Sequence, residues 1–75
     1  MSLAQLSKDE GGRVLSIRAA NVALAQRLLA MGFLPGAQLR IVQVAPFGDP
    51  ITVELNGWRV SLRRADAASV DVARV

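Results

Sequence analysis

The sequence predicts a mainly β domain, a small barrel of about five short strands with one α-helix after the first strand. The strongest observation is Asn56-Gly57, which lies between residues 51–55 and 58–63, two segments where apolar and polar residues alternate. Asn-Gly at this place is typical of a type I′ hairpin turn, because both turn positions need a positive φ. A second observation is the helical spacing of apolar residues over 22–31. The third is length, since 75 residues allow one core of modest size.

The first strand is expected over residues 13–18, after a glycine-rich polar turn. Leu15 and Ile17 share one face of this strand, while Val14 and Ser16 take the other. This two-residue period is typical of a half-buried strand, with one face against the core and one toward solvent.

The helix is expected to begin after Asn21, a good N-cap residue, and to run over residues 22–31. It carries two neighbouring apolar stripes. The first stripe comprises Leu24, Leu28 and Met31, and the second comprises Val22, Ala25 and Leu29. Such a wide apolar arc has two interpretations. Either the domain engulfs nearly the whole helix, or the second stripe is a surface that faces a partner.

A corner at residues 32–36 ends this helix and starts the next strand. Gly32 can adopt the left-handed conformation that closes helices, and Pro35-Gly36 has the residues of a type II turn. Phe33 and Leu34 supply apolar anchors between them. We therefore expect the corner to fix the helix against the barrel. Two residues that point to its sides are candidate partner-binding residues: Arg27 and Leu29.

A long strand is expected over residues 38–45, and its end is apolar on both faces, which predicts a bulge or a bend. Two prolines within residues 46–50 exclude a central strand there, so this segment is expected to be an ordered loop. Phe47 is its one large apolar residue and a further candidate partner-binding residue. A single carboxylate makes a weak cation site, and the ordinary role of Asp49 is to cap its own turn by accepting backbone N–H bonds.

A short helical turn is expected over residues 64–68 and a last strand over 70–75. Five strands with this order of helices predict an SH3-like small barrel, a single domain over residues 1–75. An open five-stranded α+β sheet is the alternative. In the barrel, we expect the terminal strands to cover edges that would otherwise pair with other chains.

The residue types predict a protein that is not an enzyme. The chain has no His and no Cys, which removes the usual general base, the thiol nucleophile and the strongest metal ligands. Its six carboxylates are scattered, and it has no glycine-rich phosphate-binding loop. We therefore expect no catalytic residue, no cofactor and no metal site. No segment has the pattern of a signal peptide or a membrane span, so the expected location is cytoplasmic.

The basic residues form another candidate surface. The formal net charge is +3, and eight of the nine basic residues are Arg. Arg59 and Arg63 alternate with the apolar residues of their strand and so point outward together, with Arg64 adjoining them. Arginine favours forked contacts with carboxylates and phosphates, so this patch is either a docking site for an acidic partner or a charged edge that prevents aggregation. The same composition suggests a small nucleic-acid-binding barrel as an alternative, which the sparse aromatic residues disfavour.

Four blocks of the sequence carry a family resemblance. They are Arg27-Leu28-x-x-Met31-Gly32-Phe33-x-Pro35-Gly36, Ala45-Pro46-Phe47-Gly48-Asp49-Pro50, Gly57, and Leu62-Arg63-x-x-Asp66-Ala67. Their order and spacing resemble the FeoA family, the small cytoplasmic components of bacterial ferrous iron uptake. The resemblance covers about residues 3–75. Asp66 stands where the family more often has Glu, a difference that keeps the charge.

The resemblance implies an SH3-like accessory protein for FeoB, the membrane Fe(II) transporter with a cytoplasmic GTP-binding domain. The implied role is binding and regulation, not transport. The implied location is the inner face of the bacterial inner membrane, which the chain would reach only through its partner. Iron-dependent repressors carry a related domain, but this chain has no DNA-binding helix-turn-helix, so no nucleic-acid partner is expected. Self-association through strand edges or the wide apolar helix is a further expectation.

Overall fold

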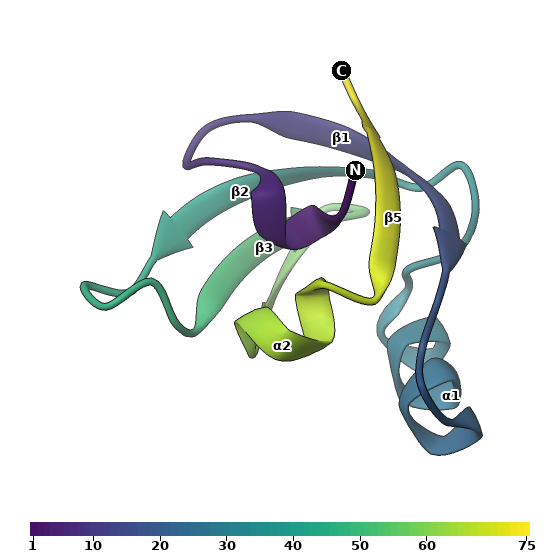
Figure 1. Ribbon diagram of the computed structural model, residues 1–75. Coiled ribbons are helices and arrows are strands. Elements are labelled where there is room, and N and C mark those ends of the chain that lie inside the picture. The colour runs from purple at the N-terminus through teal and green to yellow at the C-terminus, as the bar shows by residue number, and fades with distance from the viewer.

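Five antiparallel strands form one sheet that curves around an apolar core in the computed structural model, which describes residues 1–75 (Figure 1). A short 3₁₀-helix, η1, precedes them. The elements in chain order are η1 (Leu3–Gln5), β1 (Gly11–Ile17), α1 (Val22–Met31), β2 (Gln38–Val44), β3 (Ile51–Leu55), β4 (Trp58–Leu62), α2 (Arg64–Ala67) and β5 (Val70–Arg74). The order across the sheet is β4-β3-β2-β1-β5. This architecture confirms the predicted mainly β, SH3-like small barrel.

The β3–β4 hairpin has the turn that its sequence predicts. Asn56 has a φ of 53° and Gly57 a φ of 89°, backbone conformations that Asn and Gly adopt more readily than other residues. The turn places Leu55 opposite Trp58. Every second residue of β3 is buried, as the alternation predicts. The hairpin is therefore specified by local sequence.

Bulges interrupt two of the strands. The bulge in β2 falls between Ile41 and Gln43 and confirms the predicted irregularity of this strand. A second bulge, between Val14 and Ser16 of β1, was not predicted. It leaves Leu15 without a partner on β5. Val14 is buried, like Gly12 two positions before it, while Leu15 is 46% exposed. The face of β1 that carries Val14 is thus the inner one at this point.

The core is apolar throughout. Fourteen buried residues form one cluster: Leu3, Leu6, Val14, Leu28, Phe33, Leu39, Ile41, Ile51, Val53, Leu55, Leu62, Ala67, Val70 and Val72. No polar or charged residue is buried. Of these core residues, Leu3 begins η1 and Leu6 directly follows it. The sequence pattern did not predict this element because three residues show no helical period. The N-terminal segment is therefore part of the packed structure.

The corner after α1 is built largely as expected. Gly32 has a φ of 109°, and its N–H donates to the carbonyl oxygens of Leu28 and Leu29, which closes the helix. Phe33 is fully buried and is the largest of the fully buried side chains. Leu34, predicted to be a second anchor, is instead 53% exposed, because only Phe33 reaches the core.

Helix α1 stands away from the barrel (Figure 1). Asn21 caps it as predicted, with Oδ1 accepting from the N–H of Leu24 at 2.8 Å. Leu28 is its one buried residue, whereas Val22 is 71% exposed and Leu29 is also exposed. The interpretation that the domain engulfs this helix is therefore wrong, and two of the three residues in its second apolar stripe face solvent.

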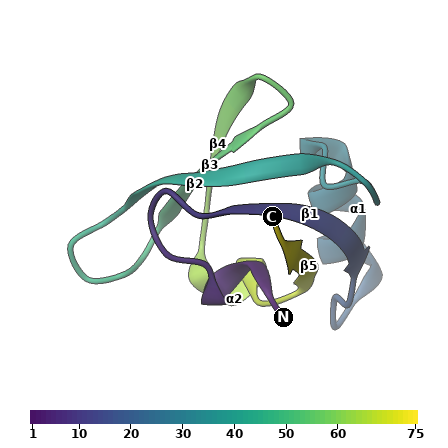
Figure 2. The ribbon, with the colours of Figure 1, turned by 90° about the horizontal axis from the view of Figure 1, so that it is seen from above.

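The two edges of the sheet do not pair with each other, so the expected closure of the barrel by its terminal strands is wrong. The N-terminal segment covers part of β5 instead. The N–H of Val72 donates to the carbonyl oxygen of Met1 at 2.8 Å, and Ser2 forms an isolated antiparallel bridge with Asp71. The β3–β4 hairpin projects away from β1 and β5 (Figure 2). None of the helices has the length and apolar character that crossing a membrane requires.

Candidate functional site

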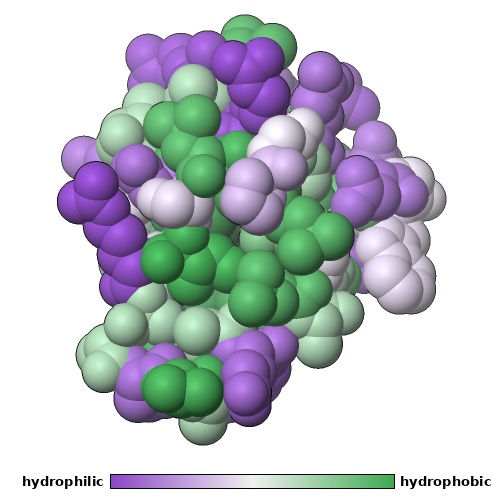
Figure 3. Space-filling view, turned by 90° about the vertical axis from the view of Figure 1, so that its right-hand side faces the viewer, coloured by the Kyte–Doolittle hydropathy of each residue, from purple (hydrophilic) through white to green (hydrophobic).

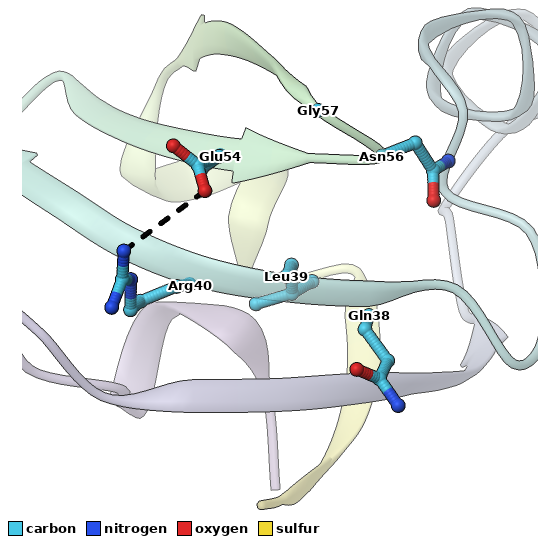
Figure 4. A pocket seen from close by; sticks show the side chains of 6 residues that line it. All are labelled: Gln38, Leu39, Arg40, Glu54, Asn56 and Gly57. Carbon is cyan, nitrogen blue, oxygen red and sulfur yellow. Dashed lines mark ion pairs between the residues drawn. The ribbon is translucent and has the colours of Figure 1, made fainter.

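The predicted arginine pair lies on and beside β4. Arg59 belongs to the strand, Arg63 directly follows it, and both side chains are exposed. Arg59 Nε lies 4.0 Å from one oxygen of Glu54, and Arg40 Nη2 lies 4.0 Å from the other (Figure 4 shows the Arg40 pair). One carboxylate therefore serves two guanidinium groups, while Arg63 has no carboxylate within ion-pair distance. This surface keeps an excess of positive charge, which suits an acidic partner.

A shallow hollow of about 330 Å³ adjoins this surface where β2 meets the hairpin turn (Figure 4). Leu39 is its one hydrophobic lining residue, and the others are Gln38, Arg40, Glu54, Asn56 and Gly57. It contains no nucleophile, and its two charged side chains pair with each other. The hollow offers hydrogen-bonding groups to a partner but no evident reactive group.

Arg64 differs from its neighbour Arg63 although both were predicted to belong to one patch. Its guanidinium group donates to two backbone carbonyls, that of Gly48 at 2.8 Å and that of Ala4. The group is partly buried and links η1 to the β2–β3 loop. In this structure the charge of Arg64 therefore supports the fold, and its role in partner binding stays a prediction.

Asp49 caps the start of α2. Its Oδ1 accepts from the backbone N–H of Arg64 at 3.0 Å. The expectation that Asp49 caps its own turn is therefore wrong, because the β2–β3 loop lies against the first residue of α2. An N-terminal cap of this kind satisfies a helix N–H that has no partner within the helix.

Both candidates on α1 are exposed, and they point to different sides of the helix. Leu29 is exposed, and Arg27 Nη2 lies 3.1 Å from Asp66 Oδ2 of α2. Sequence reasoning did not foresee this ion pair, although both residues belong to the blocks that resemble a known family. Their separation of 39 positions hides the contact from any local pattern.

Phe47 is fully exposed at the tip of the β2–β3 loop. This loop and α1 lie at opposite ends of the molecule in both ribbon views (Figures 1 and 2). The structure therefore divides the six predicted residues among α1, the edge strand β4 with the start of α2, and the β2–β3 loop. They do not form one continuous patch.

An apolar face lies near α1, and the sequence pattern predicted only the part of it that the helix itself contributes. Figure 3 views the side of the molecule on which α1 lies, and apolar side chains gather across its centre. Leu15, Val22, Leu29 and Leu34 are the large exposed apolar residues of β1, α1 and the corner that follows. Leu15 alternates with buried Gly12 and Val14, which places its side chain on the outer face of β1. The alternation in the sequence did not show which face of this strand is the inner one.

Acidic side chains do not converge in this structure. No group of three or more Asp or Glu lies close enough together to hold a metal ion. The arrangement is instead one of surfaces: a basic strand edge, an apolar face and an exposed aromatic loop. Aromatic residues and Arg are enriched at interfaces between proteins.

Comparison with known proteins identifies the family. The FeoA domain model matches residues 1–74. A fusion of Fe(2+) transport protein A with the Fe(2+) transporter FeoB, from Porphyromonas gingivalis, is 35% identical over 96% of this chain, which spans only 8% of that relative's length. The FeoA protein of Chlorobium tepidum is 35% identical and superposes with a TM-score of 0.91, over 100% of this chain and 70% of that one.

A further structure agrees. Stenotrophomonas maltophilia FeoA in complex with zinc, described as a prokaryotic SH3 domain protein, is 34% identical with a TM-score of 0.85, over 97% of this chain and 89% of that one. The sequence blocks, the fold and the family model therefore agree, and the chain belongs to the FeoA domain family.

Proposed function

We propose that this chain is an accessory protein of ferrous iron uptake that docks on the cytoplasmic, GTP-binding part of a FeoB transporter. The observation that carries the proposal is the Porphyromonas gingivalis protein, in which a FeoA part and a FeoB transporter share one chain. Proteins that are fused in one organism and separate in another commonly act together. The predicted cytoplasmic location, at the inner face of the inner membrane, follows from this partner.

The proposed role is regulation through binding, not catalysis. The chain has no His and no Cys, and its charged side chains are paired or exposed on the surface. Docking would bias the GTP cycle or the assembly of the transporter, since a bound protein shifts an equilibrium by its difference in affinity for the two states.

Two surfaces support docking better than the others. The first is the basic edge formed by Arg59 and Arg63, which keeps positive charge for an acidic partner. The second is the apolar face near α1, where Leu29 is exposed on the helix. Phe47 is a third, isolated contact at the other end of the molecule.

Titration with the cytoplasmic domain of FeoB, followed by backbone amide NMR shifts, tests the proposal. We expect shifts to cluster on one of these surfaces. Arg59→Glu with Arg63→Glu should weaken docking if the basic edge binds, and Leu29→Asp should do so if the apolar face binds. Arg13→Glu, an exposed arginine of β1 with no carboxylate partner, is the matched control. Absence of shifts at saturating FeoB domain would contradict the proposal.

The nucleic-acid alternative is not favoured. Five arginines lie within 4.0 Å of a carboxylate: Arg18, Arg27, Arg40, Arg59 and Arg74. Arg64 is engaged with backbone carbonyls. The basic residues therefore form no continuous stripe that could follow a phosphate backbone. Affinity for oligonucleotides that falls steeply with salt would restore this alternative.

A further inference from the structure

The outer edge of β4 has no backbone partner. β4 lies at one end of the sheet and pairs only with β3. None of the backbone hydrogen bonds outside the helices and strand ladders involves residues 58–62. Strand β5, at the other end, is different because Met1 and Ser2 cover part of it. The molecule therefore has one bare edge strand of five residues.

The register of the hairpin shows which groups face this edge. In an antiparallel ladder, pairs that exchange two hydrogen bonds alternate with pairs whose N–H and C=O groups point away. A two-residue turn makes Leu55–Trp58 a hydrogen-bonded pair. The N–H and C=O groups of Arg59 and Ser61 therefore point outward, where an added strand would meet them.

The side chains beside the edge differ on its two faces. Arg59, Ser61 and Arg63 share the outward face, and all three are exposed. Trp58, which is 62% exposed, and half-buried Val60 lie on the opposite face. A strand added here would need acidic residues on one face and apolar residues on the other, that is, alternation of the two types.

We propose that the β4 edge binds an extended segment in which acidic and apolar residues alternate, and that this segment joins the sheet as a further strand. The main-chain bonds would supply affinity, while Arg59 and Trp58 would select the side chains. We take the segment to be an acidic strand of the FeoB cytoplasmic region. Only this choice of source rests on the docking proposal.

A second copy of this chain is the less suitable occupant. Antiparallel pairing of two β4 edges would bring Arg59 and Arg63 of both copies onto one face of the joined sheet. Like charges on neighbouring strands are destabilising, and basic residues on edge strands are a common protection against such pairing. The net charge of +3 on each chain acts in the same direction.

The test uses a synthetic peptide of about six residues in which Glu and Val alternate, a length typical of one strand. We expect its addition to the full chain to shift the amide signals of Arg59 and Ser61 most strongly. A peptide of the same composition with its Glu and Val residues in two blocks should bind more weakly. The peptide can be N-methylated either at its odd-numbered or at its even-numbered amides. One of these two peptides should no longer bind, because its methyl groups replace the N–H donors that face β4, and the other should still bind. Equal binding of all these peptides would overturn the inference.

Charge exchange gives a second readout. Arg59→Glu with Arg63→Glu should weaken binding of the Glu-Val peptide by about three- to tenfold at low salt, since exposed ion pairs contribute modestly. The same variant should gain affinity for a peptide with Lys in place of Glu. Arg13→Glu should change neither affinity. Amide shifts of β4 that depend on protein concentration without peptide would show a second copy at the edge and overturn the inference.

Ser61→Pro separates this inference from the docking proposal. Proline removes the outward N–H of an edge strand, a position where proline is tolerated. If the FeoB domain binds this variant as tightly as the parent, docking stands and the inference about the edge is overturned. If the peptide binds β4 but the FeoB domain does not bind at all, docking fails and the edge remains a site for another acidic segment. If Ser61→Pro does not fold, competition for the parent chain between the Glu-Val peptide and the FeoB domain gives the same information, because displacement of one by the other requires that both use the β4 edge.

Discussion

The two edges of the sheet are protected in different ways. At β5, backbone groups of Met1 and Ser2 pair with the strand, and the adjoining Leu3 and Leu6 are buried in the core. At β4, no backbone group is paired on the outer side, and exposed arginines are the only protection. The comparison shows that the chain uses its own N-terminal segment to complete one side of the barrel. The other side is left available for a partner.

The largest effect is expected at the covered edge. Leu3→Ala should lower the free energy of unfolding by about 2–5 kcal/mol, because it removes a fully buried side chain and leaves a cavity. Urea denaturation followed by circular dichroism measures this change. Trp58→Ala at the open edge is the matched comparison and should cost about 0.5 kcal/mol or less, as for most surface substitutions. A similar cost for both substitutions would mean that the two edges are equally integrated into the fold.

The next largest effect is expected where α1 meets the open hairpin. Gly32→Val should destabilise the protein by about 1–3 kcal/mol, because a β-branched residue is strained at a φ of 109°. A Cβ there would also lie 3.3 Å from Leu55 Cδ2 of β3. Thermal unfolding measures the loss. Gly32→Asn should cost less, since Asn tolerates the left-handed region. If Gly32→Val is as stable as the parent, the left-handed conformation of Gly32 is not what ends the helix.

Local chemistry made much of this structure predictable. Asn56-Gly57 fixes the hairpin turn, Asn21 and Gly32 fix the two ends of α1, and each acts over a few residues. The outward direction of Arg59 likewise follows from alternation along one strand. These features could be read from the sequence because no distant segment is needed to produce them.

The features that were missed depend on contacts between distant segments. The bulge at Leu15 arises from the register with β5, more than fifty positions along the chain. The inward direction of Arg64 depends on how the β2–β3 loop approaches η1. The cover of β5 by the N-terminal segment has the same origin. The individual candidate residues on α1, β4 and the β2–β3 loop could therefore be predicted from the sequence, but their arrangement in space could not.

Arg64 and Arg63 extend the comparison of edges to two neighbouring residues. Arg64→Ala should lower the free energy of unfolding by about 1–2 kcal/mol, because the carbonyls of Gly48 and Ala4 lose a charged donor. Arg63→Ala should change it by less than about 0.5 kcal/mol. When both variants are folded, Arg63→Ala should weaken binding to the FeoB domain more than Arg64→Ala does. A stability loss that is larger for Arg63 than for Arg64 would contradict the assignment of Arg64 to the fold.

The smallest effect is expected for the ion pair between α1 and α2. Arg27→Ala should cost about 0.2–1 kcal/mol, since Arg27 is largely exposed and exposed pairs contribute little. The coupling energy with Asp66→Asn, measured in a double-mutant cycle, should fall as salt rises. Because this ion pair contributes so little to stability, Arg27 can leave Asp66 and pair with a carboxylate of a partner at a small cost in free energy. If the coupling instead exceeds about 2 kcal/mol and is insensitive to salt, Arg27 serves to fix α1 on the barrel, and the apolar face near α1 is held rigid rather than adaptable.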